Sequence, residues 1–234
     1  MSTGMSEDFS ATIINLKQQI QQLDITIEHN KAEYIMLLNR LANMYHQAAQ
    51  HDEQHQNLLQ ALKTLQEALR YCESRRFPNM YAILNVNLGN IYVELSELEN
   101  THHNLLKALD AYQETLLNTN PNVPNATYAT MQNNLGNVCR RLAQFEDRDR
   151  NLQRALTAYK EALKFFRPET APLAYATLQA NIGIVQSDLG DLAQAAQAWR
   201  AAADVAAHVG ALEEAQYFYQ LAQQVENGDH PDAS

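Results

Sequence analysis

Asparagine residues recur along this chain at intervals that suit peptide binding. Two columns of them each repeat every 47 residues, and the second column lies three residues before the first. A carboxamide carries both a donor and an acceptor, so it can pair with the C=O and N–H groups of a peptide backbone. We expect such binding; the alternative is that one column bonds to neighbouring helices and orders the protein itself. The columns consist of Asn43, Asn90 and Asn137, and of Asn87, Asn134 and Asn181.

Two adjacent arginines add positive charge to the same predicted surface. Arg140 and Arg141 suit an acidic ligand group, because a guanidinium pairs with a carboxylate through two parallel hydrogen bonds. The alternative is a surface ion pair with Glu94 or Asp188. Asn39 and His46 belong to the same predicted binding surface.

Histidines gather at the junctions between predicted helices, where they raise the question of a metal site. The residues concerned are His51, His55, His102 and His103. Histidines four residues apart on a helix can bind zinc, but the zinc-protease motif needs Glu directly after the first His, where this chain has Asp52. We therefore predict solvated polar loops rather than a metal site. Phosphate-binding and nucleophile motifs are also missing, so we predict a protein that is not an enzyme and uses no cofactor.

The composition excludes several other classes of protein. The chain has 234 residues, of which 46% are hydrophobic and 19% charged, which is incompatible with a wholly disordered protein. A net charge of −10 disfavours binding to nucleic acid or to an anionic membrane. Two cysteines are too few for a disulfide framework and fit a reducing compartment. Without an apolar run long enough for a membrane span or a signal-peptide layout, we expect a cytoplasmic protein.

A repeat of 47 residues positions these side chains. It is clearest at Tyr34, Tyr81, Tyr128 and Tyr175, and each copy holds two stretches with apolar residues at helical spacing. Near the middle of the first stretch stands a small residue: Ala42, Gly89, Gly136 or Gly183. A mid-helix glycine costs about 1 kcal/mol relative to alanine. We attribute it to close approach of the second helix through Ala61, Ala108 or Ala155.

A further asparagine recurs where the second helix of each pair begins. We interpret Asn57, Asn104 and Asn151 as N-caps, whose side-chain oxygen would accept from backbone N–H groups of the first turn.

The pattern resembles the tetratricopeptide repeat family. The last copy carries the family's residues at their usual spacing: Ile182, Gly183, Ala195, Trp199 and Ala202. The usual period is 34, so the chain is similar to the longer-period arrays of kinesin light chains and of proteins beside bacterial proteases. The resemblance implies an all-α, right-handed solenoid of about four helix pairs. It also implies a concave groove, lined by the first helices, that binds an extended or helical segment of another protein.

Predicted boundaries follow from the repeat. We expect one solenoid over residues 9–227 between disordered ends at 1–8 and 228–234. It comprises a cap helix at 9–30, repeats at 34–80, 81–127, 128–174 and 175–209, and a second cap helix at 211–227. The first cap carries an apolar stripe from Ile13 to Ile27, with its helix predicted over Asn15 to Ile27. The main alternative to an adaptor is a homo-oligomeric assembly subunit, with a homodimer formed through this stripe.

Overall fold

The computed structural model describes residues 2–118 and 126–228. Within those ranges every regular element is an α-helix, which confirms the all-α prediction. The chain forms two compact units, Met1–Pro121 and Asn122–Ser234, each considered by itself below. Continuity of one right-handed solenoid across both units stays a prediction. None of the described helices is long and apolar enough to span a membrane.

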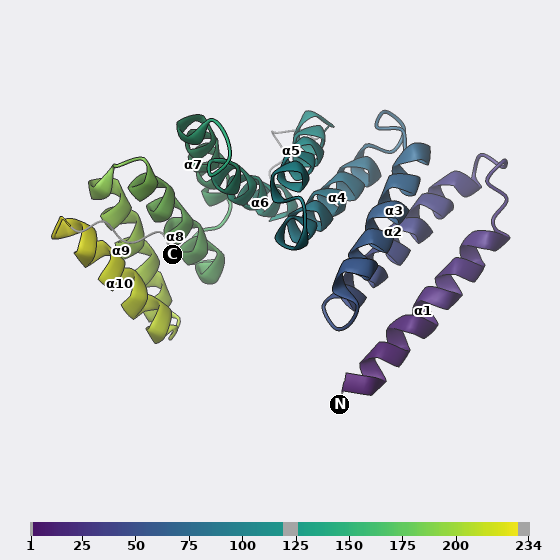
Figure 1. Ribbon diagram of the computed structural model, residues 1–234, viewed down its shortest axis with the longest axis horizontal. Coiled ribbons are helices and arrows are strands. Elements are labelled where there is room, and N and C mark those ends of the chain that lie inside the picture. Colours follow the sequence, from purple (N-terminus) through teal and green to yellow (C-terminus); the bar gives the residue numbers. More distant parts are fainter. Residues whose placement is uncertain (1, 119–125, 229–234) are drawn as a thin grey trace. The chain divides into compact units, whose positions relative to one another are not determined.

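The first unit contains two helix pairs preceded by a single helix (Figure 1). Its helices are α1 (Ser2–Gln22), α2 (Asn30–Ala49), α3 (Gln54–Tyr71), α4 (Pro78–Leu98) and α5 (Thr101–Asn118). Helix α2 pairs with α3 and α4 with α5, while α1 packs on α2 and α3 packs on α4. Helix α1 overlaps the cap helix expected at 9–30 but has different ends, because it begins at Ser2 and ends at Gln22 without reaching Ile27. Asp24 explains the stop: its carboxylate accepts from the Thr26 backbone N–H at 3.0 Å, which favours a turn.

The second unit contains two further pairs followed by a single helix. Its helices are α6 (Ala126–Leu142), α7 (Arg148–Leu163), α8 (Pro172–Asp188), α9 (Leu192–His208) and α10 (Leu212–Glu226). Each of these helices packs against the next along the chain. Helix α10 matches the predicted second cap and covers α9 through Ala215, Ala222 and Val225, all buried.

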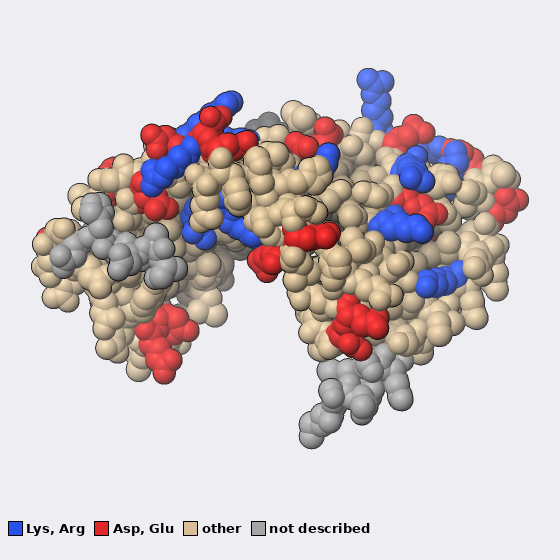
Figure 2. All heavy atoms as spheres, viewed as in Figure 1, with Lys and Arg blue, Asp and Glu red and all other residues tan. Residues whose placement is uncertain are grey.

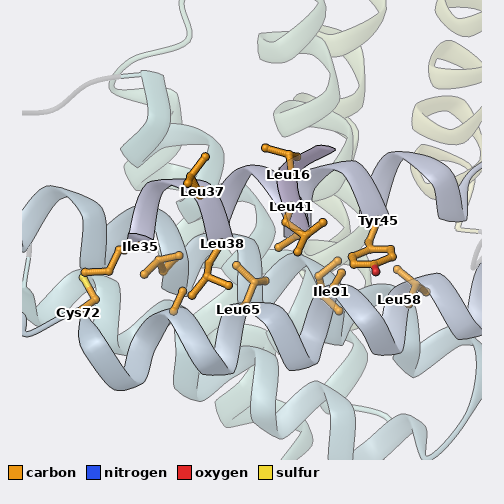
Figure 3. Packing of buried hydrophobic residues seen from close by; sticks show 14 of the residues in the cluster. Leu16, Ile35, Leu37, Leu38, Leu41, Tyr45, Leu58, Leu65, Cys72 and Ile91 are labelled. Carbon is orange, nitrogen blue, oxygen red and sulfur yellow. The ribbon is translucent and has the colours of Figure 1, made fainter. Parts of the chain in front are cut away.

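The core of the first unit lies between its layers of helices (Figure 3). Leu16 of α1 faces α2, while Ile35, Leu38 and Leu41 of α2 meet Leu65 of α3 in the same cluster. Burial of apolar surface of this kind contributes about 25 cal/mol per Å². The core therefore aligns the first helices, α2 and α4, whose other faces carry the predicted binding residues.

Aromatic rings of the second helices, and not the predicted alanines, lie against the mid-helix glycines. A Cβ added at Gly89 would lie 2.5 Å from Cε1 of Tyr112, and one added at Gly183 would lie 2.5 Å from Nε1 of Trp199. A Cβ added at Gly136 would likewise lie too close to Cε1 of Tyr159, at 2.4 Å. Close approach is confirmed, but the ring four residues after the alanine fills the space.

The recurring asparagines at the second helices are not N-caps. The side-chain amide of Asn57 donates to the Asp52 carbonyl at 2.9 Å, and the same bond recurs at Asn104 and Asn151. Each amide thus holds the carbonyl of the residue before a left-handed backbone position, at which Glu53, for example, has a φ of 44°. The amide is a donor that closes the loop instead of an acceptor that caps the helix.

Candidate peptide-binding surface

The first helices of neighbouring pairs adjoin through polar side chains. In the first unit these helices are α2 and α4, and in the second unit they are α6 and α8. We call the surface formed by each couple of helices the first-helix face of its unit. All ten predicted binding residues lie on these four helices.

Three asparagines connect the two helices of the first unit. The side-chain nitrogen of Asn87 donates to Oδ1 of Asn39 at 2.9 Å and to Oδ1 of Asn43 at 3.2 Å. Both protons of the Asn87 amide are therefore used between the helices, while all three side chains stay partly exposed. The structure brings these three predicted residues together.

The same arrangement recurs 94 residues later, in the second unit. Asn181 of α8 donates to Oδ1 of Asn133 and to Oδ1 of Asn137 of α6, both at 3.5 Å. These bonds are longer than those of the first unit and correspondingly weaker. Asn133 stands two repeats after Asn39 in the sequence and takes the same role.

Two asparagines of the predicted ladder also bond to tyrosines of their own helix pair. The Tyr112 hydroxyl donates to Oδ1 of Asn90 at 2.6 Å, and the Tyr159 hydroxyl donates to Oδ1 of Asn137 at 2.7 Å. Both tyrosine side chains are fully buried, so each hydroxyl needs such an acceptor. Part of the ladder therefore serves the fold, as the alternative reading of the sequence allowed, but the tyrosine partners were not predicted. The available signal was the identical separation of 22 residues in both pairs.

What remains exposed is a donor on one asparagine and an acceptor on its neighbour. In the described part of the chain, Nδ2 of Asn43 and Oδ1 of Asn87 have no recorded partner. The same holds for Nδ2 of Asn137 and Oδ1 of Asn181. We call Asn43 with Asn87, and Asn137 with Asn181, the two amide couples. Each couple offers the donor and the acceptor that the sequence argument assigned to a single asparagine.

Apolar side chains stand beside the amide couple of the first unit. Met36 is 46% exposed and Ile83 is 43% exposed, at equivalent positions of α2 and α4. They lie on the same helix faces as Asn43 and Asn87, at spacings of seven and four residues. The equivalent positions of α6 and α8 hold exposed threonines. The two first-helix faces thus share amides and differ in polarity.

Charges on the faces are partly neutralised within the protein. His46 of α2 contacts Glu94 of α4, so the predicted binding residue His46 already has a partner. Asp188 of α8 is held by Arg148, whose guanidinium donates to the Asp188 backbone carbonyl at 2.6 Å. In Figure 2, basic and acidic side chains are interspersed on the viewed face, and most of that face is uncharged.

Arg140 bonds to the Tyr159 hydroxyl, but its guanidinium is only partly satisfied. Its Nε is buried and has no hydrogen-bond partner within the described residues, and Asp188, which was weighed as an alternative ion-pair partner, is bound by Arg148 instead. It lies beside the Tyr159 hydroxyl: burial raises the pKa of Tyr159, and the neighbouring Arg140 charge opposes that rise. Arg141 follows on the same helix and is partly buried, as is Asn134.

The histidines do not all lie in solvated loops as predicted. His102 and His103 belong to the first turn of α5, and the ring of His51 stacks on Phe9 with centroids 5.4 Å apart. His55 lies 3.3 Å from a Glu99 carboxylate oxygen. Among the described residues, no group of three or more metal-ligating side chains comes together.

Comparisons with known proteins reveal only distant similarities. No family model matches the chain, and no curated protein does. Among solved structures, MamA shares 15% identity over 75% of this chain and 92% of its own, with a TM-score of 0.46. BtubC (BKLC) from P. vanneervenii shares 17% identity over 98% and 95% of the two chains, with a TM-score of 0.48. The TPR2AB-domain:pHSP90 complex of yeast Sti1 shares 15% identity over 94% and 80%, with a TM-score of 0.40. At these values the fold rests on the helix pairs themselves, and membership of the tetratricopeptide family stays a prediction.

Proposed function

We propose that the protein is a non-enzymatic interaction scaffold that binds an extended segment of a partner protein on its first-helix faces. The amide couples carry this proposal. In each couple, one bond between the asparagines orients both side chains, so that a donor and an acceptor stay exposed side by side. An extended backbone presents a C=O and an N–H that can bond to such a couple without regard to side-chain identity.

The apolar neighbours support the same proposal. An extended segment places alternate side chains on opposite sides of its backbone. Side chains that point toward the first unit would meet Met36 and Ile83, which are otherwise exposed to water. Contact with these two residues would add apolar burial to hydrogen bonds that are individually modest.

A selection from a random library of short peptides tests the proposal, with dissociation constants then measured for the selected peptides. The test variants are Asn87→Ala and Asn181→Ala, because neither removes an acceptor from a buried tyrosine hydroxyl. The control variants are Gln56→Ala and Gln153→Ala, which remove exposed amides from the second helices α3 and α7. Circular dichroism is used to check that all four variants fold.

We expect each test variant to weaken binding at its own unit by about fivefold, the effect of losing one net hydrogen bond. The controls should bind as the wild type does. Peptides that bind equally well to Asn87→Ala, Asn181→Ala and the wild type would move the binding site away from the amide couples. A wild-type protein that selects no peptide at all would contradict the proposed function.

Assembly of copies of the chain is a second candidate, favoured by one feature of α10. Leu212 and Tyr217 on this last helix are 67% and 57% exposed, which is high for large side chains. Light scattering over a range of protein concentrations tests this candidate. Concentration-dependent association that Leu212→Ser abolishes would support assembly, and a constant monomer mass would exclude it.

A further inference from the structure

A crevice of about 220 Å³ lies among the first three helices of the first unit. Its lining residues come from α1, α2 and α3, and none of them belongs to an amide couple. Pockets that take drug-sized ligands enclose about 300–1,000 Å³, so this crevice suits a smaller molecule.

The crevice combines apolar surface with positive charge. Leu38 and Leu41 of α2 are buried and Ile20 of α1 is partly buried, and these three side chains supply its apolar lining. Lys17 of α1 and Lys63 of α3 are both exposed and bring positive charge from two different helices. Within the described residues no ion pair is recorded for either lysine. A ligand with an apolar body and an anionic head would match both kinds of surface.

One carboxylate also lines the crevice, but it already has a partner. Glu67 of α3 accepts a hydrogen bond from the Tyr34 hydroxyl at 2.6 Å. The other polar lining residues, Gln21, Gln60 and Thr64, are uncharged. Two lysines against one carboxylate leave the crevice with a positive charge, in a protein whose net charge is −10. The local charge therefore favours a monoanion.

Tyr45 adds a hydroxyl that lacks a partner. This residue lines the crevice, is only 7% exposed, and has the Lys17 ammonium 5.4 Å from its ring centroid. At the equivalent position of the next pair, the Tyr92 hydroxyl accepts from the Gln66 side chain of α3 at 3.3 Å. Helix α1 precedes α2 as α3 precedes α4, but no hydrogen bond to the Tyr45 hydroxyl is recorded within the described residues. Because a buried tyrosine hydroxyl normally has a partner, this one suits an acceptor that enters the crevice.

We propose that the crevice binds a small amphipathic monocarboxylate. Its carboxylate lies between Lys17 and Lys63 and accepts from the Tyr45 hydroxyl, while its apolar body covers Leu38 and Leu41. The net charge of the protein repels anions at long range, but physiological salt screens distant charges, so the short contacts determine the affinity. The site is separate from the amide couples and does not depend on the proposed function.

Titration of the full chain with two carboxylates and their neutral amides, followed by nuclear magnetic resonance, tests the proposal. The probes are hexanoate with hexanamide, and benzoate with benzamide, so that each pair shares an apolar body and differs in charge. Dissociation constants are measured for the wild type, Lys17→Gln, Lys63→Gln and Tyr45→Phe. The control is Lys107→Gln, which removes an exposed lysine from α5 of the same unit. Circular dichroism is used to check that every variant folds.

We expect a wild-type dissociation constant of about 1 mM for at least one of the acids, about tenfold tighter than for its amide. Lys17→Gln and Lys63→Gln should each reduce that ratio, and Lys107→Gln should keep it. Tyr45→Phe should weaken the acid and its amide alike, by about fivefold, because the hydroxyl can donate to either carbonyl oxygen.

Three results would overturn the proposal. The first is equal binding of acids and amides by the wild type, and the second is a ratio that falls as much in Lys107→Gln as in Lys17→Gln. The third is no binding of either acid below about 10 mM, or binding that shifts resonances only of residues outside the crevice. None of these results would bear on peptide binding by the amide couples, so the two proposals fail separately.

Discussion

At the scale of single residues, the glycine and the ring that covers it form one unit of packing. Gly89 leaves room for Tyr112, whose hydroxyl then reaches Asn90. The first pair holds the alternative combination, in which Ala42 and Leu65 occupy the same two positions. The same contact is thus made by a glycine and a large ring in the second pair, and by an alanine and a smaller leucine in the first pair. The period of 47 predicts the positions of the small mid-helix residues. It does not predict which side chain of the second helix contacts them, because that depends on where the aromatic ring lies.

A substitution at Gly89 tests this packing. Gly89→Ala should lower the free energy of unfolding by about 1–3 kcal/mol, because the new methyl group collides with Tyr112 and overpacks the core. Intrinsic helix propensity alone predicts a gain of about 1 kcal/mol, so the sign of the change discriminates between the two effects. Urea unfolding measures it. The double variant with Tyr112→Leu should recover part of the loss, and a Gly89→Ala protein more stable than the wild type would refute the contact.

The buried thiol of Cys139 makes a prediction about pH. Burial raises the pKa of Cys139 to about 11, whereas a thiol in water ionises near 8.5. The folded state therefore retains this proton more tightly, and the thiol's contribution to stability is lost as the pH rises from about 8.5 to about 11. Alkylation at about pH 8.5 should accordingly be much slower in the folded protein than in urea. Equal rates in both states would show that the thiol is accessible and readily ionised.

At the scale of elements, the loops inside three of the pairs share one design. Glu53, Asn100 and Asp147 each adopt a left-handed backbone with φ between 41° and 46°, and an asparagine four residues later holds the carbonyl just before them. The bond compensates for a conformation that non-glycine residues disfavour. The last pair does not need the asparagine bond, because Gly190 supplies the positive φ and Asp191 caps α9.

Asn57 provides the test of this loop. Asn57→Ala should lower the free energy of unfolding by about 1 kcal/mol, because the Asp52 carbonyl loses its donor. Gln56→Ala, one residue earlier and exposed, should change stability by less than about 0.5 kcal/mol. Urea unfolding followed by circular dichroism compares the two. Equal stability of both variants would mean that the Asn57 amide contributes nothing to the loop.

How far the sequence anticipates these elements depends on the range of the interactions. The limits of α10 follow from local helical spacing and from Gly210, so they were predictable. The end of α1 was not, because its apolar stripe continues to Ile27 beyond the turn at Asp24. Likewise, the columns of Asn43 and Asn87 were visible in the sequence, but the bond between them was not. That bond depends on how two helices from different pairs approach each other.

At the scale of the whole molecule, the chain behaves as two packed units in which each helix contacts mainly its neighbours. In such repeat arrays the stability of one part depends on its own helices and on adjacent interfaces. The single tryptophan, Trp199, lies in the second unit and is fully buried, so its fluorescence reports on that unit. Circular dichroism reports on the helices of both units.

A core substitution in the first unit tests whether the two units unfold independently. Leu65→Ala should cost about 2–5 kcal/mol within that unit, since the Leu65 side chain is fully buried. The urea midpoint seen by circular dichroism should fall further than the midpoint seen by Trp199 fluorescence. Coincident shifts of both midpoints would show that the molecule unfolds as one cooperative body.

The most direct test of the account is the position of a bound peptide in a crystal structure of the complex, using a peptide selected by the wild type. The account predicts that a peptide carbonyl accepts from Nδ2 of Asn43 or Asn137, while a peptide N–H donates to Oδ1 of Asn87 or Asn181. A peptide seated on the second helices or on α10, with both amide couples unchanged, would contradict it.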